Sequence, residues 1–281
     1  MRILFIGGDV RMRYAAEKLA EKHETVWLDC KETVPKPNGI FDVIVLPLPL
    51  SKDGRTLFAP DKKDPPTFDE LFDIIRTLAD ERTLVFAGGE NPVLTKHCES
   101  LGCRLANYFA NEKLTLQNAV LTAEAALCLL ISSTDGALLG SEILVTGSGR
   151  IAVFLAERLR ACGASVTFAA RSPSKRELLK LSGYSAISIE ELSEEVFKAD
   201  FIVNTIPAPI FGEEMFSRMG KNVVFMELAS LPRQPYEAFA DKFNIKYIYA
   251  GGLPGKYSPR AAGEFIALVV GEETERIDAN E

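Results

Sequence analysis

Short apolar runs alternate with amphipathic segments along the whole chain. The apolar runs are rich in Val, Ile, Leu and Phe, which is typical of strands buried on both faces. They lie at residues 1–6, 24–29, 42–48, 83–87, 104–109, 142–146, 165–170, 201–205, 222–228 and 246–249. Helices are predicted at residues 11–21, 68–79, 92–101, 114–133, 153–162, 175–181, 190–198, 213–219, 235–243 and 259–271, followed by an acidic tail that we expect to fray. This alternation predicts the α/β class.

The chain repeats its own opening. A shift of 140 residues aligns strand, glycine turn, helix and strand in both parts without a gap. The identical pairs are Ile3/Ile143, Leu4/Leu144, Gly7/Gly147, Ala16/Ala156, Glu17/Glu157, Leu19/Leu159 and Val26/Val166. The repeat predicts two tandem doubly wound Rossmann-like domains with parallel sheets, joined by long inter-domain helices. We place a first domain at 1–113, an inter-domain helix at 114–135, a second domain at 136–256, and a C-terminal helix and tail at 257–281.

The second copy carries the pattern of a dinucleotide-binding turn, because a strand and two spaced glycines in residues 143–152 lead into the helix predicted at 153–162. Gly147 allows the sharp turn, Gly149 lets the backbone approach a pyrophosphate, and Ala152 lets the helix lie close to its strand. The N–H groups at the start of that helix favour phosphate.

The first copy departs from this pattern at one decisive place. Asp9 takes the position of Gly149, and its carboxylate would crowd and repel a pyrophosphate. We therefore expect the second domain to bind the nucleotide, and the first to serve the substrate.

The end of the second strand of the nucleotide domain indicates which cofactor binds. An acidic residue there selects NAD by binding the ribose hydroxyls, but this strand ends in Ala170, Arg171 and Ser172. Arg171 offers a planar guanidinium for a 2′-phosphate, and Ser174, Lys175 and Arg176 follow it. We predict NADP(H) in preference to NAD(H); the alternative is that Arg171 is simply a solvated residue at the strand end.

Composition narrows the remaining classes. Apolar residues make up 47% of the chain and charged residues 25%, and the net charge of −7 argues against nucleic-acid or anionic membrane surfaces. No pair of cysteines has CxxC spacing, which argues against a disulfide framework and a metal site; the cysteines are Cys30, Cys98, Cys103, Cys128 and Cys162. The apolar run 119–131 is short for a bilayer and contains Glu124, and the N-terminus does not resemble a signal peptide. We expect a cytoplasmic protein.

The segment 49–66 interrupts the first domain. It is long and charged, so we expect a solvated excursion, with a functional lid as the alternative. Thr67 and Glu70, just after it, have the spacing of a capping box, and Gly102 lies where a helix C-terminal glycine is expected.

The sequence contains no evident pair of residues for proton transfer. His23 ends a predicted helix and His97 lies within one, so both are expected to be surface or capping residues. Alcohol oxidation needs a base that titrates near neutrality, which argues against a 2-hydroxy-acid dehydrogenase. The remaining candidate acids and bases are Asp9, Glu90, Glu124 and Glu227.

A collinear series of motifs resembles the family of the dipicolinate synthase A chain over nearly the whole sequence. Besides residues 1–11, the motifs are NAVLTAEA (118–125), GSGRIA (147–152), AARS (169–172), NTIPAP (204–209), MELASLP (226–232) and GGLPGKYSPRAAGEF (251–265). The resemblance implies NADP-dependent oxidation of dihydrodipicolinate, or its hydrated precursor, to dipicolinate during sporulation. It also implies a flavoprotein-like second subunit, the B chain of dipicolinate synthase, as partner.

The resemblance also implies site residues. Those expected to contact the cofactor are Gly147, Ser148, Gly149, Arg150, Ile151, Arg171, Ser172, Thr205, Ile206, Pro207, Ala229 and Leu253. Those expected on the substrate side are Gly8, Asp9, Arg11, Asn118 and Thr122. Arg11 is our first choice for binding a substrate carboxylate, the alternative being an exposed first-turn residue. Catalytic candidates are Asp9, Arg11, Asn118 and Glu227, without an assigned acid or base.

Two other interpretations remain open. The chain could be a D-2-hydroxy-acid or shikimate-type dehydrogenase, although residues 252–255 lack the histidine that the former would carry there. It could instead be a non-catalytic subunit that senses nucleotide and regulates a partner. Domains of this kind often dimerise through the nucleotide half, so a homo-oligomer is also open.

Overall fold

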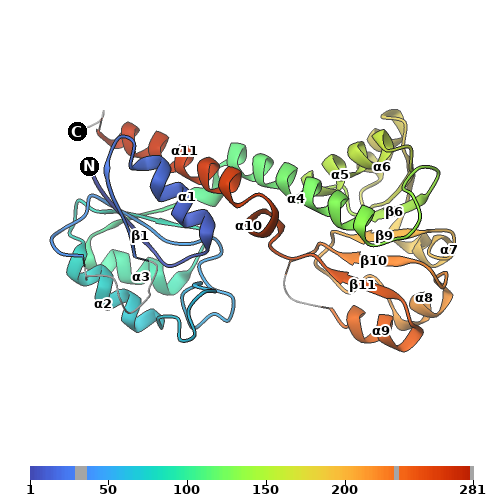
Figure 1. Cartoon of the computed structure of the whole chain (residues 1–281), viewed down its shortest axis with the longest axis horizontal. Coiled ribbons are helices and arrows are strands. Elements are labelled where there is room, and N and C mark those ends of the chain that lie inside the picture. Colours follow the sequence, from blue (N-terminus) through green and yellow to red (C-terminus); the bar gives the residue numbers. More distant parts are fainter. Residues whose placement is uncertain (29–36, 231–233, 279–281) are drawn as a thin grey trace. The chain divides into compact units, whose positions relative to one another are not determined.

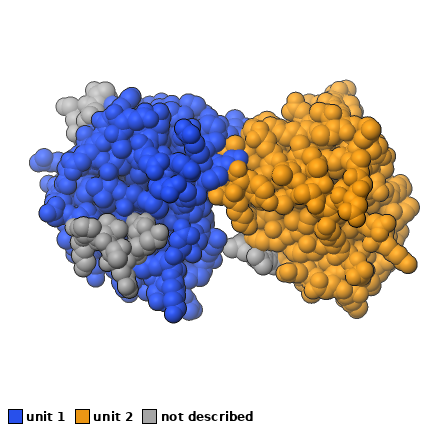
Figure 2. All heavy atoms as spheres, viewed as in Figure 1, with its two compact units in different colours: residues 1–118, 258–281 blue, residues 119–257 orange. Residues whose placement is uncertain are grey.

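The structure, a computed structural model, describes residues 1–28, 37–230 and 234–278. Cys30 and the last two residues of the MELASLP motif, Leu231 and Pro232, lie outside the described residues. The chain divides into two compact units, residues 1–118 with 258–281 and residues 119–257 (Figure 2). Both are α/β units with an all-parallel sheet, which confirms the predicted fold class.

Unit 1 has a five-stranded sheet of order β2-β1-β3-β4-β5. All strands are parallel, and the order in which the chain adds them reverses between β1 and β3. Its strands are β1 (Arg2–Ile6), β2 (Glu24–Leu28), β3 (Val43–Val45), β4 (Leu84–Ala87) and β5 (Arg104–Asn107). Its helices are α1 (Val10–Leu19), α2 (Phe68–Leu78), α3 (Pro92–Leu101), the 3-10 turn η1 (Tyr108–Ala110), the start of α4 (Glu112–Ser132) and α11 (Pro259–Asp278). Alternate residues of β1 face opposite ways: Leu4 and Ile6 pack toward α2 and α3, whereas Ile3 and Phe5 pack toward α1 and α11.

The C-terminal helix completes unit 1. Figure 1 shows α11 beside α1, and a Cβ added at Gly263 would approach the backbone oxygen of Arg11 to 2.4 Å. The two helices therefore pack in close backbone contact. The prediction that the acidic tail frays after Gly271 is wrong, since α11 continues to Asp278 and Thr274 is 1% exposed.

Unit 2 has a six-stranded sheet of order β11-β10-β9-β6-β7-β8, reversing between β6 and β9. Its strands are β6 (Glu142–Thr146), β7 (Ser165–Ala169), β8 (Ser185–Ile187), β9 (Phe201–Asn204), β10 (Val224–Glu227) and β11 (Lys246–Tyr249). Its helical segments besides α4 are α5 (Arg150–Ala161), α6 (Pro173–Leu181), η2 (Ile189–Glu191), α7 (Leu192–Glu195), α8 (Glu213–Arg218), α9 (Tyr236–Phe243) and α10 (Leu253–Tyr257). Strand β8 was not predicted, because three residues are too short to give a periodic pattern.

Helix α4 is long and apolar enough to cross a membrane by length and composition alone, because it extends beyond both ends of the apolar run 119–131. Its residues Ala123, Ala126 and Leu130 are fully buried in the core of unit 2. Burial of this kind is what the core helix of a soluble domain shows.

Local signals placed the ends of two helices in unit 1 correctly. Thr67 and Glu70 form a reciprocal capping box at the start of α2, and Gly102 ends α3 with a left-handed φ of 73°. These predictions are confirmed.

Candidate functional site

The glycine turn of unit 2 is shaped to accept a phosphate group. Gly147 has φ +96°, and a Cβ there would approach Thr205 Oγ1 to 2.4 Å, so only glycine fits. Among the described residues of the chain, a Cβ at Gly149 would meet no atom within 4 Å, and no side chain caps helix α5, which Gly149 precedes. The helix start therefore faces open space, which suits the pyrophosphate of a dinucleotide.

The glycine turn of unit 1 is closed by its own side chains. The Asp9 carboxylate caps α1 by accepting a hydrogen bond from the Arg11 N–H at 3.0 Å. Gly8 N–H donates to the Phe58 carbonyl at 2.7 Å, and a Cβ at Gly7 would approach Leu57 Cδ2 to 2.7 Å. Asp9 therefore holds the place that an anionic ligand would need.

The segment 49–66 is a structural part of unit 1. The side chains of Leu50, Leu57, Phe58 and Ala59 are all less than 9% exposed, and Leu57 packs in the core with β1 and α2. The expectation of a solvated excursion is wrong. The charged residues of the segment concealed apolar positions that cover the end of β1.

The adenosine end of unit 2 presents a cation. Arg171 is exposed just after β7, and Arg176 donates to the carbonyl oxygens of Ala170 and Arg171, both at 2.8 Å. Ser172 caps α6 and lies 3.0 Å from the Ser174 hydroxyl. Arg176 thus shapes the turn that holds Arg171, whereas the sequence had suggested only that it adds charge.

A buried polar network joins the carboxyl ends of β6, β9 and β10. The Asn204 amide nitrogen donates to the Glu227 carboxyl oxygens at 3.0 and 3.1 Å, and the Thr146 hydroxyl donates to Asn204 Oδ1. The Ile206 N–H donates to Asn204 Oδ1, and Asn204 Nδ2 donates to the Ile206 carbonyl oxygen, each at 3.2 Å. The Asn204 side chain therefore holds the 205–207 loop through both the N–H and the carbonyl oxygen of Ile206.

Glu227 is held in this network with little water. It is 3% exposed, and one of its oxygens accepts a hydrogen bond from the Ala229 N–H at 3.1 Å. Burial raises the pKa of Glu227 to about 7, although the hydrogen bonds from Asn204 and Ala229 act in the opposite direction. From the sequence, Asn204 was a candidate only as the first residue of the NTIPAP motif (204–209), a polar residue ending an otherwise apolar strand, and it was given no role.

Three of the residues expected near the nicotinamide are held by contacts within unit 2. The Thr205 hydroxyl donates to the Thr146 carbonyl at 2.7 Å, which ties the loop to the glycine turn. Ala229 is 6% and Leu253 2% exposed, and Leu253 packs in the core of unit 2.

On the substrate side, Arg11 is 7% exposed, so the alternative of an exposed first-turn residue is wrong. Its Nε donates to Asp9 at 2.8 Å, and its Nη2 donates to the Leu48 carbonyl. Gly8 precedes this pair with φ +83°. Asn118 and Thr122 lie one turn apart on α4, where Asn118 belongs to unit 1 and Thr122 to unit 2.

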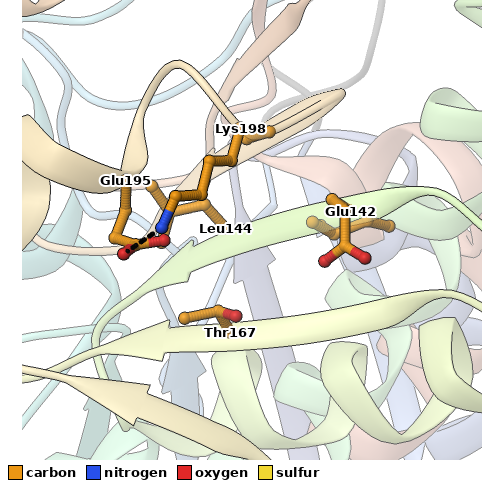
Figure 3. Close-up of a pocket in the computed structure, with 7 residues that line it drawn as sticks. Glu142, Leu144, Thr167, Glu195 and Lys198 are labelled. Atoms are coloured by element: carbon orange, nitrogen blue, oxygen red, sulfur yellow. Dashed lines mark hydrogen bonds and ion pairs between the residues drawn. The ribbon is translucent and has the colours of Figure 1, made fainter.

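Two other features carry no candidate chemistry. The His97 ring packs against α2, where it stacks on Phe72 with ring centroids 4.2 Å apart. Burial lowers the pKa of His97. A cavity of about 110 Å³ opens at the amino ends of β6 and β7, lined in part by Thr167 and by an ion pair between Glu195 and Lys198 (Figure 3). It lies at the opposite end of these strands from the glycine turn, and none of the predicted site residues lines it.

Two family models match the chain. Residues 2–109 match the N-terminal domain of the dipicolinate synthase A chain, and residues 132–231 match the NAD binding domain of D-isomer specific 2-hydroxyacid dehydrogenases. The second match confirms a nicotinamide-nucleotide domain and the class of NAD(P)-dependent oxidoreductases.

Relatives of full length agree with this. The dipicolinate synthase A chain of Bacillus subtilis (strain 168) is 27% identical, over 100% of this chain and 98% of that protein. The crystal structure of dipicolinate synthase, A chain, from Bacillus subtilis superposes with a TM-score of 0.83 at 26% identity, covering 100% and 98% of the two chains. The corresponding crystal structure from Bacillus halodurans, 22% identical over 97% of each chain, has the same fold with a TM-score of 0.83. The resemblance predicted from the motifs is confirmed.

Proposed function

We propose, from its confirmed resemblance to the dipicolinate synthase A chain, that this protein oxidises dihydrodipicolinate or its hydrated precursor to dipicolinate with NADP⁺. In this reaction the bound cofactor would accept a hydride from the carbon next to the ring nitrogen, and the ring would release a proton to become aromatic; the hydrated precursor would also lose water. The product is aromatic, so the reaction needs less help from a general base than an alcohol oxidation does. This suits a chain whose two described histidines, His23 and His97, both belong to unit 1 and not to the nucleotide unit.

The observation that carries the proposal is the contrast between the two glycine turns. Unit 2 offers an uncapped helix start next to open space, whereas the corresponding helix of unit 1 is capped by a carboxylate. A dinucleotide pyrophosphate fits the first and is repelled by the second. Gly147, Ser148, Gly149, Arg150 and Ile151 would therefore hold the pyrophosphate.

NADP(H) is favoured by the charge at the end of β7. Arg171 is exposed, and no described acidic residue follows the strand before α6, so a 2′-phosphate meets a cation in place of a carboxylate. Ser172 would donate to the same phosphate. Thr205, Ile206 and Pro207 would border the nicotinamide, together with Ala229 and the backbone at Leu253.

Unit 1 supplies the candidate groups for the dicarboxylate. Arg11 uses Nε and Nη2 within the unit, and Nη1 makes no hydrogen bond to any residue that the structure describes, so we propose that Nη1 binds a substrate carboxylate. Asp9 holds the guanidinium in place. Gly8 and Asn118, also of unit 1, and Thr122 of unit 2 are proposed to complete the substrate contacts.

The relatives of this chain are the A subunit of dipicolinate synthase, and a subunit of that name implies a partner subunit. We propose that this partner is the flavoprotein-like B chain of dipicolinate synthase, that both act in the cytoplasm of sporulating cells, and that this protein can form a homo-oligomer.

The test is to incubate the purified chain with dihydrodipicolinate and NADP⁺, with and without the flavoprotein-like partner. Reduced nicotinamide and dipicolinate should appear together, and exchanging NADP⁺ for NAD⁺ should slow the reaction. Binding of cofactor without turnover in either mixture would instead support a nucleotide-sensing role. Because residues 132–231 match a 2-hydroxyacid dehydrogenase domain, a panel of D-2-hydroxy acids is the matched control. Turnover of those acids alone would contradict the proposal.

A further inference from the structure

The carboxyl end of β10 holds a buried ionisable group to which the proposed reaction gives no role. Glu227 accepts hydrogen bonds from Asn204 and from the Ala229 N–H. Among the residues that the structure describes, no cation forms an ion pair with it. Within the described residues a carboxylate in this position is stabilised by two neutral donors, so these residues compensate its charge incompletely.

The topology places this charge under one half of the nucleotide site. In a sheet of this order, a dinucleotide crosses the point where the strand order reverses, here between β6 and β9. The adenosine half then lies over the half of the sheet that contains β7, and the nicotinamide half over the half that contains β10. Asn204 and Glu227, the last residues of β9 and β10, end their strands on the nicotinamide side.

We infer that Glu227 makes the site discriminate between the two redox forms of the cofactor, favouring the oxidised form. An oxidised nicotinamide ring carries a positive charge that the reduced ring lacks, and a carboxylate beneath it attracts only the former. The inference rests on the proposed function and deepens it. The same charge would strengthen binding of NADP⁺ before hydride transfer and offer NADPH no such attraction afterwards.

Binding and ionisation are then linked. Near neutral pH part of the free protein carries a protonated Glu227, whose elevated pKa is caused by burial. Binding of the cationic ring favours the carboxylate, so the protonated form releases one proton to solvent as NADP⁺ binds. NADPH gives no such release. Affinity for NADP⁺ should therefore rise with pH, relative to NADPH.

The elements packed around Glu227 carry other ionisable groups. Those facing it from neighbouring described elements are phenols: Tyr236 on α9, and Tyr249, its register partner on β11. Burial raises the pKa of Tyr236 above its ordinary value, and its hydroxyl donates to the Ala208 carbonyl oxygen at 3.0 Å. Tyr236 therefore stays neutral where Glu227 ionises.

The experiment is calorimetric titration of the full chain with NADP⁺ and with NADPH at about pH 6 and about pH 8.5. Contacts to the adenosine half and its 2′-phosphate are common to both forms, so they cancel in the ratio of the two Kd values. We expect the Kd for NADP⁺, divided by the Kd for NADPH, to be about tenfold smaller at the higher pH, the equivalent of one pKa unit. Glu227→Gln keeps the size and the acceptor for Asn204, and should abolish the shift. Glu227→Asp should retain its direction.

The matched control is Glu142→Gln, an exposed carboxyl at the other end of β6, which should behave like the native chain. If Glu227→Gln does not fold, proton release by the native chain decides, measured near pH 7 in two buffers of different ionisation enthalpy. Equal proton release with both cofactors, or an unchanged Kd ratio in Glu227→Gln, overturns this inference and leaves the proposed function intact. Failure of the native chain to bind either form overturns both.

Discussion

The two glycine turns of this molecule show how the same local scaffold acquires opposite binding properties. Both follow the first strand of a parallel sheet and precede a helix, at Gly7–Asp9 and at Gly147–Gly149. In unit 1 the helix start is capped by Asp9, and Leu57 and Phe58 cover the turn. In unit 2 the same place is uncapped and open. The difference teaches that capping chemistry and one nearby segment, more than the strand–turn–helix pattern, decide whether a phosphate can bind.

The sharpest test of the comparison transfers the carboxylate of unit 1 to unit 2. Gly149 has φ −82° and a Cβ there would meet no atom within 4 Å, so Gly149→Asp fits sterically. A carboxylate about 4 Å from a phosphate charge costs about 4 kcal/mol at an effective dielectric near 20, or roughly a thousandfold in Kd. Calorimetric titration with NADP⁺ measures the loss. Gly149→Asn is the uncharged control and should lose far less; equal loss in both would assign the effect to shape.

The reverse change removes the carboxylate from unit 1. Asp9→Ala takes away the cap of α1 and leaves the buried Arg11 without its partner, so the free energy of unfolding should fall by about 3 kcal/mol. Denaturant unfolding monitored by circular dichroism gives the value. Glu17→Ala breaks the exposed pair with Arg13 and should cost less than about 0.5 kcal/mol. A similar small cost for Asp9→Ala would mean that the pair contributes little to the fold of unit 1.

A third test concerns the helix that only unit 1 receives from the end of the chain. Gly263→Ala places a Cβ against the α1 backbone, so the free energy of unfolding should fall by about 2 kcal/mol. Gly271→Ala on the same helix is the control, because its Cβ would meet only Leu19 Cδ2 at 3.4 Å. Thermal unfolding compares the two variants. Equal melting temperatures would show that α11 does not need the close approach.

The smallest expected effect concerns the preference of unit 2 for NADP⁺ over NAD⁺. Arg171→Ala removes the exposed cation after β7 and should weaken NADP⁺ by about tenfold, about 1.4 kcal/mol, while leaving NAD⁺ nearly unchanged. Parallel titrations with the two cofactors measure the difference. Lys175→Ala, on the exposed surface of α6, is the neighbouring-charge control. Equal weakening of both cofactors would remove Arg171 from the 2′-phosphate site.

Much of the fold was predictable because its signals are local. The strand–turn–helix of unit 2, the capping box of Thr67 and Glu70, and the end of α3 at Gly102 each depend on residues within one turn or one supersecondary unit. The 140-residue repeat extended this reasoning from one unit to the other. The class of cofactor followed for the same reason, since the phosphate site is built from consecutive residues.

The sequence could not show which distant residues would meet. Whether Arg11 is buried depends on Asp9 and on the Leu48 carbonyl in the segment that follows β3. The ionisation of Glu227 depends on Asn204 from the neighbouring strand, and the cover over Gly7 on Leu57 from the inserted segment. A periodic pattern states that a residue is polar or apolar, not which partner it finds.

The sequence by itself determined the two α/β units, the nucleotide turn and the cation after the second strand of unit 2. Each of these follows from backbone sterics and from short-range periodicity, which nearby residues fix. Only the tertiary structure decided that α11 returns to unit 1, that residues 49–66 close its turn, and that a buried carboxyl lies at the end of β10. These features depend on contacts between segments far apart in the chain, where burial and hydrogen bonding set the energy of each group.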